Sequence, residues 1–471
     1  MRATRRRLTT EILRLRKSRP VSTRDGRNAR LRLVVRGAGV ALVIAAVGTV
    51  GRARGAEGAK AESATAPGLT LADCLRRAET APSPVAVARR ERAIAEARVS
   101  AARAGLLPKV AATFGYTRNS PADGTDAAGS VGSFVSLNGV NQYTGLVSLS
   151  EEVDLSGRLR AAGARARADV DLANARLALA RRSLFHAVAG AYHRALLTRR
   201  LAVVAQDALA EAEAFSARTK LLSDKGEAAR ADLVRANAQA AFLRQTARAA
   251  ALDAELANQE LAAFFSDDLT TPLPLVDVFD EERPRDVRLP RFVLERPELH
   301  LLDAERRGLQ ADARGARALR LPQGAMVAEY GIDANRVAWR DRGYALVFSL
   351  SVPLFDWQAA ANRARELDLQ AEQVALGRAI AARTLHRDYE AARARVVALR
   401  EQGELARTQV TLSQENLKLS RIRYEGGEGS ALEVVSAQSE LLQARSNLYQ
   451  ALAGEKQAEA DLAIASGEEI P

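Results

Sequence analysis

Cysteine is nearly absent from this chain of 471 residues, because Cys74 stands alone. A single cysteine excludes an intrachain disulfide and any zinc site built from several thiolates, so we interpret Cys74 as a buried structural thiol. Histidine is also scarce, with His186, His193, His300 and His386 all in stretches that we predict to be helical. None of them belongs to a compact metal-ligand motif, and the sequence contains no phosphate-binding loop or nucleophile elbow. We therefore expect neither an enzyme nor a bound metal or cofactor.

The net charge of +12 comes from the first 60 residues, and the rest of the chain has no excess of basic residues. Residues 1–60 hold 16 Lys and Arg against 3 Asp and Glu, which leaves 53 basic and 54 acidic residues in the remainder. Binding to a nucleic-acid backbone requires a basic surface that neutralises phosphates. The remainder of the chain has no such excess, so we expect no nucleic-acid partner.

Long apolar runs are absent as well. The apolar run at residues 37–51 (GAGVALVIAAVGTVG) is shorter than the roughly 18 residues that suggest a membrane-spanning helix. It follows a basic segment and precedes small residues, which is the layout of a secretory signal peptide, here over residues 1–55. An N-terminal membrane anchor is the alternative. No later stretch is longer, so a membrane-spanning part of this chain would have to consist of strands.

The sequence contains an internal duplication. The segment GEAARADLVRAN at residues 226–237 returns as GEGSALEVVSAQ at residues 427–438, a shift of 201 residues. Such a repeat indicates two copies of one structural unit. We assign the first repeat to residues 69–265 and the second to residues 297–467, with a connector rich in Pro and acidic residues at 266–296. Only the second copy has a tyrosine before the turn, and we expect a longer glycine turn there.

Each repeat contains one very long helix. Apolar residues, mostly Ala and Leu, recur every three or four positions over residues 155–223, as in a coiled-coil seam. The counterpart is at residues 356–424. Shorter helices are predicted before and after each, and their combined length is close to that of the long helix. We therefore expect two short helices end to end beside each long one, namely 70–106 with 228–265 and 297–319 with 429–465.

A pair of strands precedes each long helix. Val110, Ala112, Phe114 and Tyr116 alternate with small or polar residues, and further alternating runs cover 143–153 and 344–352. One apolar face and one small or polar face is the pattern of a transmembrane barrel wall, although the edge strand of a soluble sandwich alternates in the same way. Polar connections at 118–142 and 333–343 are typical of loops in solvent.

Four strands cannot close into a barrel. An open sheet edge in hydrocarbon leaves backbone groups without hydrogen bonds, so strands that span a membrane must belong to a closed barrel. Two copies of the chain would supply eight strands, whose side chains fill the interior, whereas three copies would supply twelve and leave a water-filled lumen. The long helices would continue the barrel wall as a helical tube.

Six segments begin at Leu69 (LTLADCLRRA), Ala104 (AGLLPKVAATFGY), Val153 (VDLSGRLRAA), Arg296 (RPEL), Ser351 (SVPLFDW) and Arg423 (RYEGGEGSALEVVSAQ). In their sequence and their order along the chain, they resemble the TolC-like family of outer-membrane efflux channels. The resemblance implies a mainly α fold with a transmembrane β part. In detail it implies a homotrimer with a 12-stranded outer-membrane barrel, four strands per chain, and a long periplasmic α-helical barrel. The implied partners are outer-membrane lipid, a periplasmic adaptor (membrane fusion protein) and an inner-membrane RND or ABC transporter, in efflux or type I secretion.

The resemblance also implies a gate at the periplasmic tip. Tyr424 matches the family's gating tyrosine and Glu433 its first luminal acid, whereas Ser436 stands where the second acid would be and Gly429 where an arginine would be. Glu433 as a solvated surface carboxylate is the alternative. Adaptor docking is assigned to the two turns, at Lys225, Gly226, Gly426 and Gly427. Trp357 and Gln358 replace residues that are often glycine in the family, at the bend from strand to helix.

One alternative from another class has the same helices and signal peptide. A soluble periplasmic coiled-coil adaptor or structural rod would not require the paired strands. The strands therefore distinguish the two hypotheses, and they favour a channel.

Overall fold

The computed structural model describes residues 68–118, 141–279 and 295–467. The expected signal peptide at residues 1–55 lies outside the described residues, as do most of the first strand connection and part of the connector between repeats. Within the described ranges, no helix combines the length and the apolar character that crossing a membrane would need.

The first helical stretch consists of two helices, α1 (Leu71–Thr80) and α2 (Pro84–Ala104). The prediction of one helix over residues 70–106 was therefore wrong. Prolines at positions 82 and 84 explain the break, because proline lacks the N–H of the helical ladder and moves the preceding residue to extended backbone. Ala81 and Ser83 have that extended conformation, and the Ser83 side chain caps the start of α2.

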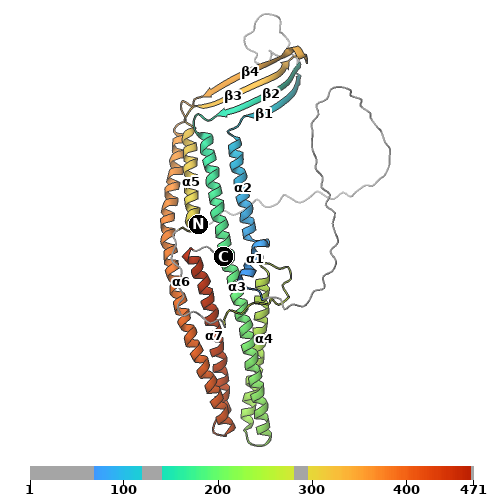
Figure 1. Cartoon of the computed structure of the whole chain (residues 1–471), viewed down its shortest axis with the longest axis vertical. Coiled ribbons are helices and arrows are strands. Elements are labelled where there is room, and N and C mark those ends of the chain that lie inside the picture. Colours follow the sequence, from blue (N-terminus) through green and yellow to red (C-terminus); the bar gives the residue numbers. More distant parts are fainter. Residues whose placement is uncertain (1–67, 119–140, 280–294, 468–471) are drawn as a thin grey trace, which may run out of the picture. The chain divides into compact units, whose positions relative to one another are not determined.

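Two helices of 67 residues dominate the fold, α3 (Arg158–Asp224) and α6 (Ala359–Glu425). Their bounds differ by the same 201 residues as the sequence repeat, and each helix is on the order of 100 Å long at 1.5 Å per residue. The end-to-end arrangement is confirmed. Helix α3 packs on α2 and on α4 (Arg230–Ala262), and α6 packs on α5 (Pro297–Ala318) and on α7 (Ala431–Ser466) (Figure 1).

The two repeats share one set of contacts. Helix α3 of the first repeat also packs against α5 and α7 of the second. Many of the buried residues along these seams are alanines, which let helices approach closely but bury little area each. A stable hydrophobic core therefore needs larger side chains somewhere along the helices.

The largest hydrophobic cluster surrounds Tyr192 at the middle of α3. The Tyr192 hydroxyl donates to the carbonyl of Val276 in the connector at 2.7 Å, and Leu69 pairs with that same segment through the Val276 N–H at 3.0 Å. Cys74 is fully buried in this cluster, and burial raises the pKa of its thiol to about 11. The interpretation of Cys74 as a buried thiol is confirmed.

Four antiparallel strands form one sheet in chain order, β1 (Lys109–Arg118), β2 (Asn141–Val153), β3 (Gln323–Ala334) and β4 (Arg342–Ser351) (Figure 1). The pairing of β2 with β3 joins the two repeats, with Val147 opposite Tyr330. Strands β1 and β4 are consequently the two edges of the sheet. Helices adjoin the same end of all four strands, because α2 and α5 lead into β1 and β3 while β2 and β4 lead into α3 and α6.

The register separates an apolar face from a polar one. Directly opposed residues share a face, and one row of them is Ala112, Val147, Tyr330 and Tyr344. The next row on the opposite face is Ala111, Ser148, Glu329 and Ala345. Large side chains on the first face are mostly exposed, with Phe114, Tyr344 and Phe348 at 83%, 80% and 77%.

The residue just before each long helix has a left-handed backbone conformation in both repeats. Gly157 precedes α3 with φ +80°, and Gln358 precedes α6 with φ +60°. Trp357 is also left-handed, so two residues with side chains stand where glycine is the less strained choice. The Asp356 carboxylate accepts the N–H groups of Gln358 and Ala360 at 3.0 and 3.1 Å, which stabilises this first turn of α6.

The two turns far from the strands are equal in length. Five residues separate α3 from α4, and five separate α6 from α7. The expectation of a longer second turn was wrong, because its extra glycines replace side chains without adding residues. Gly226 and Gly427 both have positive φ, at +79° and +77°, which closes each helix with a left-handed residue.

The α6–α7 turn contains a matched pair of glycines for a test of this geometry. We expect Gly427→Ala to weaken the turn by about 1 kcal/mol, because its φ of +77° is unfavourable for a residue with a Cβ. Hydrogen exchange at the Glu428 and Gly429 amides, which donate to Arg423, would then become about fivefold faster. Gly426→Ala is the control, because φ there is −79°. Equal exchange in the two variants would contradict the assignment.

Candidate functional site

Tyr424 lies on the last turn of α6, packed between the two helical hairpins. Its ring contacts Phe215 of α3 edge to face, with 5.2 Å between centroids. Leu417, Val434 and Leu441 belong to the same cluster, and Tyr424 is only 8% exposed. Its hydroxyl has no hydrogen-bond partner among the described residues. The tyrosine therefore joins the α6 tip to α3 by apolar contact.

Glu433 lies at the start of α7 and has two roles within one chain. Its N–H donates to the Ser430 hydroxyl at 3.4 Å, and its carboxylate reaches back to the Ser430 N–H, which forms a capping box. The same carboxylate is 3.0 Å from the Arg423 guanidinium. Ser436 is exposed one turn later. The two residues thus lie on one face of the start of α7, with Ser436 exposed and Glu433 half-buried and partly neutralised.

Gly429 lies in a tightly packed part of the turn between α6 and α7. A Cβ at Gly429 would lie 3.1 Å from the Arg423 Cβ and from the Tyr424 nitrogen. Arg423 instead supplies a guanidinium to this turn from the preceding helix, where it pairs with Glu433 and also donates to the Glu428 carbonyl at 3.4 Å. A positive charge therefore lies beside Glu433 in this turn.

Two ion pairs that the sequence analysis did not find connect α3 with α6. Arg421 lies 3.3 Å from Glu211, and Arg218 lies 3.9 Å from Glu425. Together with Phe215 and Tyr424, these four residues line a groove of about 620 Å³ between the two helices. Their spacing on α3 is a helical one, with Glu211, Phe215 and Arg218 on one face. That spacing in the sequence shows that the three side chains share one face of α3, but it does not show that they contact α6.

A buried amide distinguishes the two hairpins. Asn237 in α4 accepts a hydrogen bond from the Ser216 hydroxyl at 2.6 Å. The position 201 residues later is Gln438 in α7, which is 3% exposed and whose amide has no partner among the described residues. Leu417 replaces the serine there. Burying the Gln438 amide without a hydrogen bond therefore lowers the stability of the second hairpin, whereas the Asn237 amide of the first hairpin has a partner.

The four residues of the predicted docking turns are all exposed. Lys225 and Gly226 lie between α3 and α4, and Gly426 and Gly427 lie between α6 and α7. Both turns are at the helix ends opposite the strands. The described residues contain no group of three or more His, Cys, Asp or Glu side chains placed to bind a metal ion.

The sheet and helices together define the class of protein. An open four-stranded sheet with one apolar exposed face has the features of part of a membrane barrel wall. Helices of 67 residues that leave one end of such strands extend the barrel wall on one side of the membrane. These features define a subunit of a membrane channel with a long helical extension.

The chain belongs to the outer membrane efflux protein family, whose model matches residues 78–265 and 290–468. A curated relative is the pyoverdine export outer membrane protein OpmQ of Pseudomonas aeruginosa, 28% identical over 394 residues that cover 77% of this chain and 80% of OpmQ. The family resemblance is thereby confirmed. The protein is an outer-membrane efflux channel with a large periplasmic part.

Solved structures share the fold of this chain. The Campylobacter jejuni CmeC outer membrane channel superposes with a TM-score of 0.75 at 17% identity, covering 84% of this chain and 85% of CmeC. The Neisseria gonorrhoeae MtrE outer membrane channel, in its open state, gives 0.71 at 22% identity, covering 84% and 88%. The predicted fold class, mainly α with a β part, is confirmed for the single chain.

Proposed function

We propose that three copies of this chain form one channel, with β4 of each copy paired to β1 of the next. The observation that carries the proposal is the pair of open sheet edges in a protein of the outer membrane. Each unpaired backbone group in hydrocarbon costs several kcal/mol, so the edges must be paired. Twelve strands leave a lumen that water fills, and the polar face of the sheet lines it.

Exposed apolar residues along α6 support the same assembly. Leu405, Leu412 and Leu419 repeat every seven residues and are 65%, 62% and 52% exposed in the single chain. Helix α4 has exposed Val234, Phe242 and Leu252. A heptad stripe of this kind packs against another helix. In the proposed trimer, neighbouring copies would cover these exposed residues of α6 and α4 and close the helical tube.

The channel acts as a passive export duct from the periplasm to the exterior in an efflux or type I secretion system. Its turns at Lys225, Gly226, Gly426 and Gly427 dock on a periplasmic adaptor, which connects the duct to an inner-membrane RND or ABC transporter. Six such turns in a trimer would surround the entrance. Their exposure and their position at the helix ends opposite the strands support this assignment.

The gate is at the same end, and Tyr424, Glu433 and Ser436 belong to it. The Tyr424 ring and the ion pairs Arg421–Glu211 and Arg218–Glu425 hold α6 against α3 in the closed state. Each exposed ion pair is worth about 0.2–1 kcal/mol. Six pairs in a trimer would together contribute on the order of a few kcal/mol, enough to set whether the channel rests closed.

A double variant tests the gate. We expect Arg218→Gln with Arg421→Gln to raise the open fraction of purified channels in planar bilayers at least tenfold, because both α3–α6 ion pairs are lost. Arg407→Gln is the matched control, since Arg407 pairs with Glu404 on the same helix and connects no hairpins. The charge swap Glu211→Arg with Arg421→Glu keeps an ion pair at this position, so this variant should have an open fraction much closer to that of the parent channel than the double variant does. Equal currents in the double variant and in the control would contradict this gate.

A second variant tests whether Glu433 faces the lumen. We expect Glu433→Gln to lower the ratio of cation to anion permeability severalfold, because three carboxylates at a constriction attract cations. Glutamine retains the capping box, so the helix start remains intact. Arg423→Gln should shift the ratio in the opposite direction, since it removes the charge that partly neutralises Glu433. Unchanged selectivity in both variants would mean that Glu433 is a surface carboxylate.

A further inference from the structure

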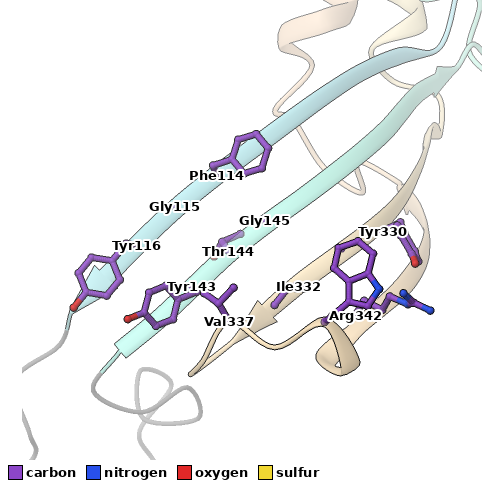
Figure 2. A pocket seen from close by; sticks show the side chains of 12 residues that line it. Phe114, Gly115, Tyr116, Tyr143, Thr144, Gly145, Tyr330, Ile332, Val337 and Arg342 are labelled. Atoms are coloured by element: carbon purple, nitrogen blue, oxygen red, sulfur yellow. The ribbon is translucent and has the colours of Figure 1, made fainter. Parts of the chain in front are cut away.

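The apolar face of the sheet carries a groove at the strand ends away from the helices. It has a volume of about 580 Å³, and aromatic rings of Phe114, Tyr116, Tyr143 and Tyr330 line it. Figure 2 shows Tyr116 and Tyr143 side by side at the ends of β1 and β2, with 5.0 Å between their ring centroids. The volume is within the range of about 300–1,000 Å³ that is usual for small-molecule sites.

The groove is a consequence of the strand register. Gly145 lies on the apolar face between Phe114 and Ile332, so the middle of that row has no side chain. Val337 and Trp339, from the connection between β3 and β4, form one wall. The short helix η1 (Trp339–Asp341) in that connection packs against β3. The result is a hollow bounded by aromatic side chains, where an even apolar surface would otherwise face the lipid.

One cation lies at the wall of this groove. The Arg342 guanidinium lies 5.2 Å from the centre of the Trp339 ring. Arg336 nearby is paired with Asp341 at 3.0 Å, whereas no carboxylate of the described residues forms an ion pair with Arg342. Arg342 is exposed in the single chain, but on a face turned toward lipid its guanidinium would be costly unless an anion paired with it, and its planar fork matches phosphate oxygens. Trp339 restricts the guanidinium and leaves its N–H donors for such a partner.

Apolar lining alone would not select a ligand here. Lipid tails are as apolar as the groove, so the hydrophobic effect does not favour one tail over another. Selection must come from the charge at Arg342 and from the fit of a chain between the aromatic rings. We propose that the groove binds an acyl chain of an anionic lipid with a phosphate headgroup, and that Arg342 binds the phosphate. The proposal depends on the barrel of the proposed function, which turns this face toward lipid.

The chain offers a direct measurement, because Trp339 and Trp357 are its two tryptophans. In a Trp357→Phe background, the fluorescence of Trp339 reports contact with lipid chains that carry bromine. Trimers are placed in phosphatidylcholine vesicles that contain the same minor fraction of brominated phosphatidylglycerol or of brominated phosphatidylcholine. We expect phosphatidylglycerol to occupy the groove with roughly fivefold preference, the effect of one basic side chain at a lipid surface.

Three variants make the test specific. Arg342→Gln should abolish the preference, whereas Arg340→Gln, which removes the same charge two residues away and outside the groove lining, should retain it. Gly145→Leu should reduce quenching of Trp339 by both lipids, because a leucine side chain would fill the groove floor. In a Trp339→Phe background, Trp357 should show no preference, because it does not line the groove.

Two results would overturn the proposal in correctly formed trimers. Equal quenching by the two lipids would show that Arg342 selects no phosphate. An equal loss in Arg342→Gln and Arg340→Gln would show a general surface charge effect. A failure of every variant and of the parent to form trimers would instead contradict the proposed function, so the two failures are distinguishable.

Discussion

A strand in hydrocarbon must have hydrogen bonds for all of its backbone N–H and C=O groups, and this constraint determines the rest of the molecule. Each chain contributes only four strands, with β1 and β4 as open edges. The chain alone cannot satisfy the constraint, so the protein's function depends on assembly. Because the two long helices begin where β2 and β4 end, the proposed assembly that closes the sheet would also bring the helices into a ring.

Packing within the chain is consistent with that dependence. Alanine seams bury little area, and larger side chains gather mainly in the cluster around Tyr192, where α1, α3, α7 and the connector meet. Elsewhere, leucines such as Leu405 and Leu412 remain exposed. At the tip, the buried Tyr424 hydroxyl and Gln438 amide have no hydrogen-bond partner among the described residues, and the ion pairs near them are of modest strength. A tip of this kind has little free energy holding it in one arrangement, which suits a gate.

Much of the fold could be predicted from the sequence, because local patterns determine it. The spacing of alanines and leucines predicted both 67-residue helices within three residues at their ends, and alternation predicted β1, β2 and β4 but gave no signal for β3. The break at Ala81 was missed because a continuous helical pattern outweighed two prolines. The site was less predictable. The pairing of Arg421 with Glu211 joins residues 210 positions apart, and the groove near Gly145 depends on strand register, which no local pattern specifies.

The number of chains in the membrane-extracted particle tests this account most directly. Outer-membrane fractions should contain a complex of three chains that resists SDS and dissociates to a single chain of at most 50.6 kDa on heating. The mass of the detergent-solubilised complex, corrected for bound detergent, would confirm three copies. A soluble monomer in periplasmic extract would contradict the account, because its two open strand edges would then have no need of closure.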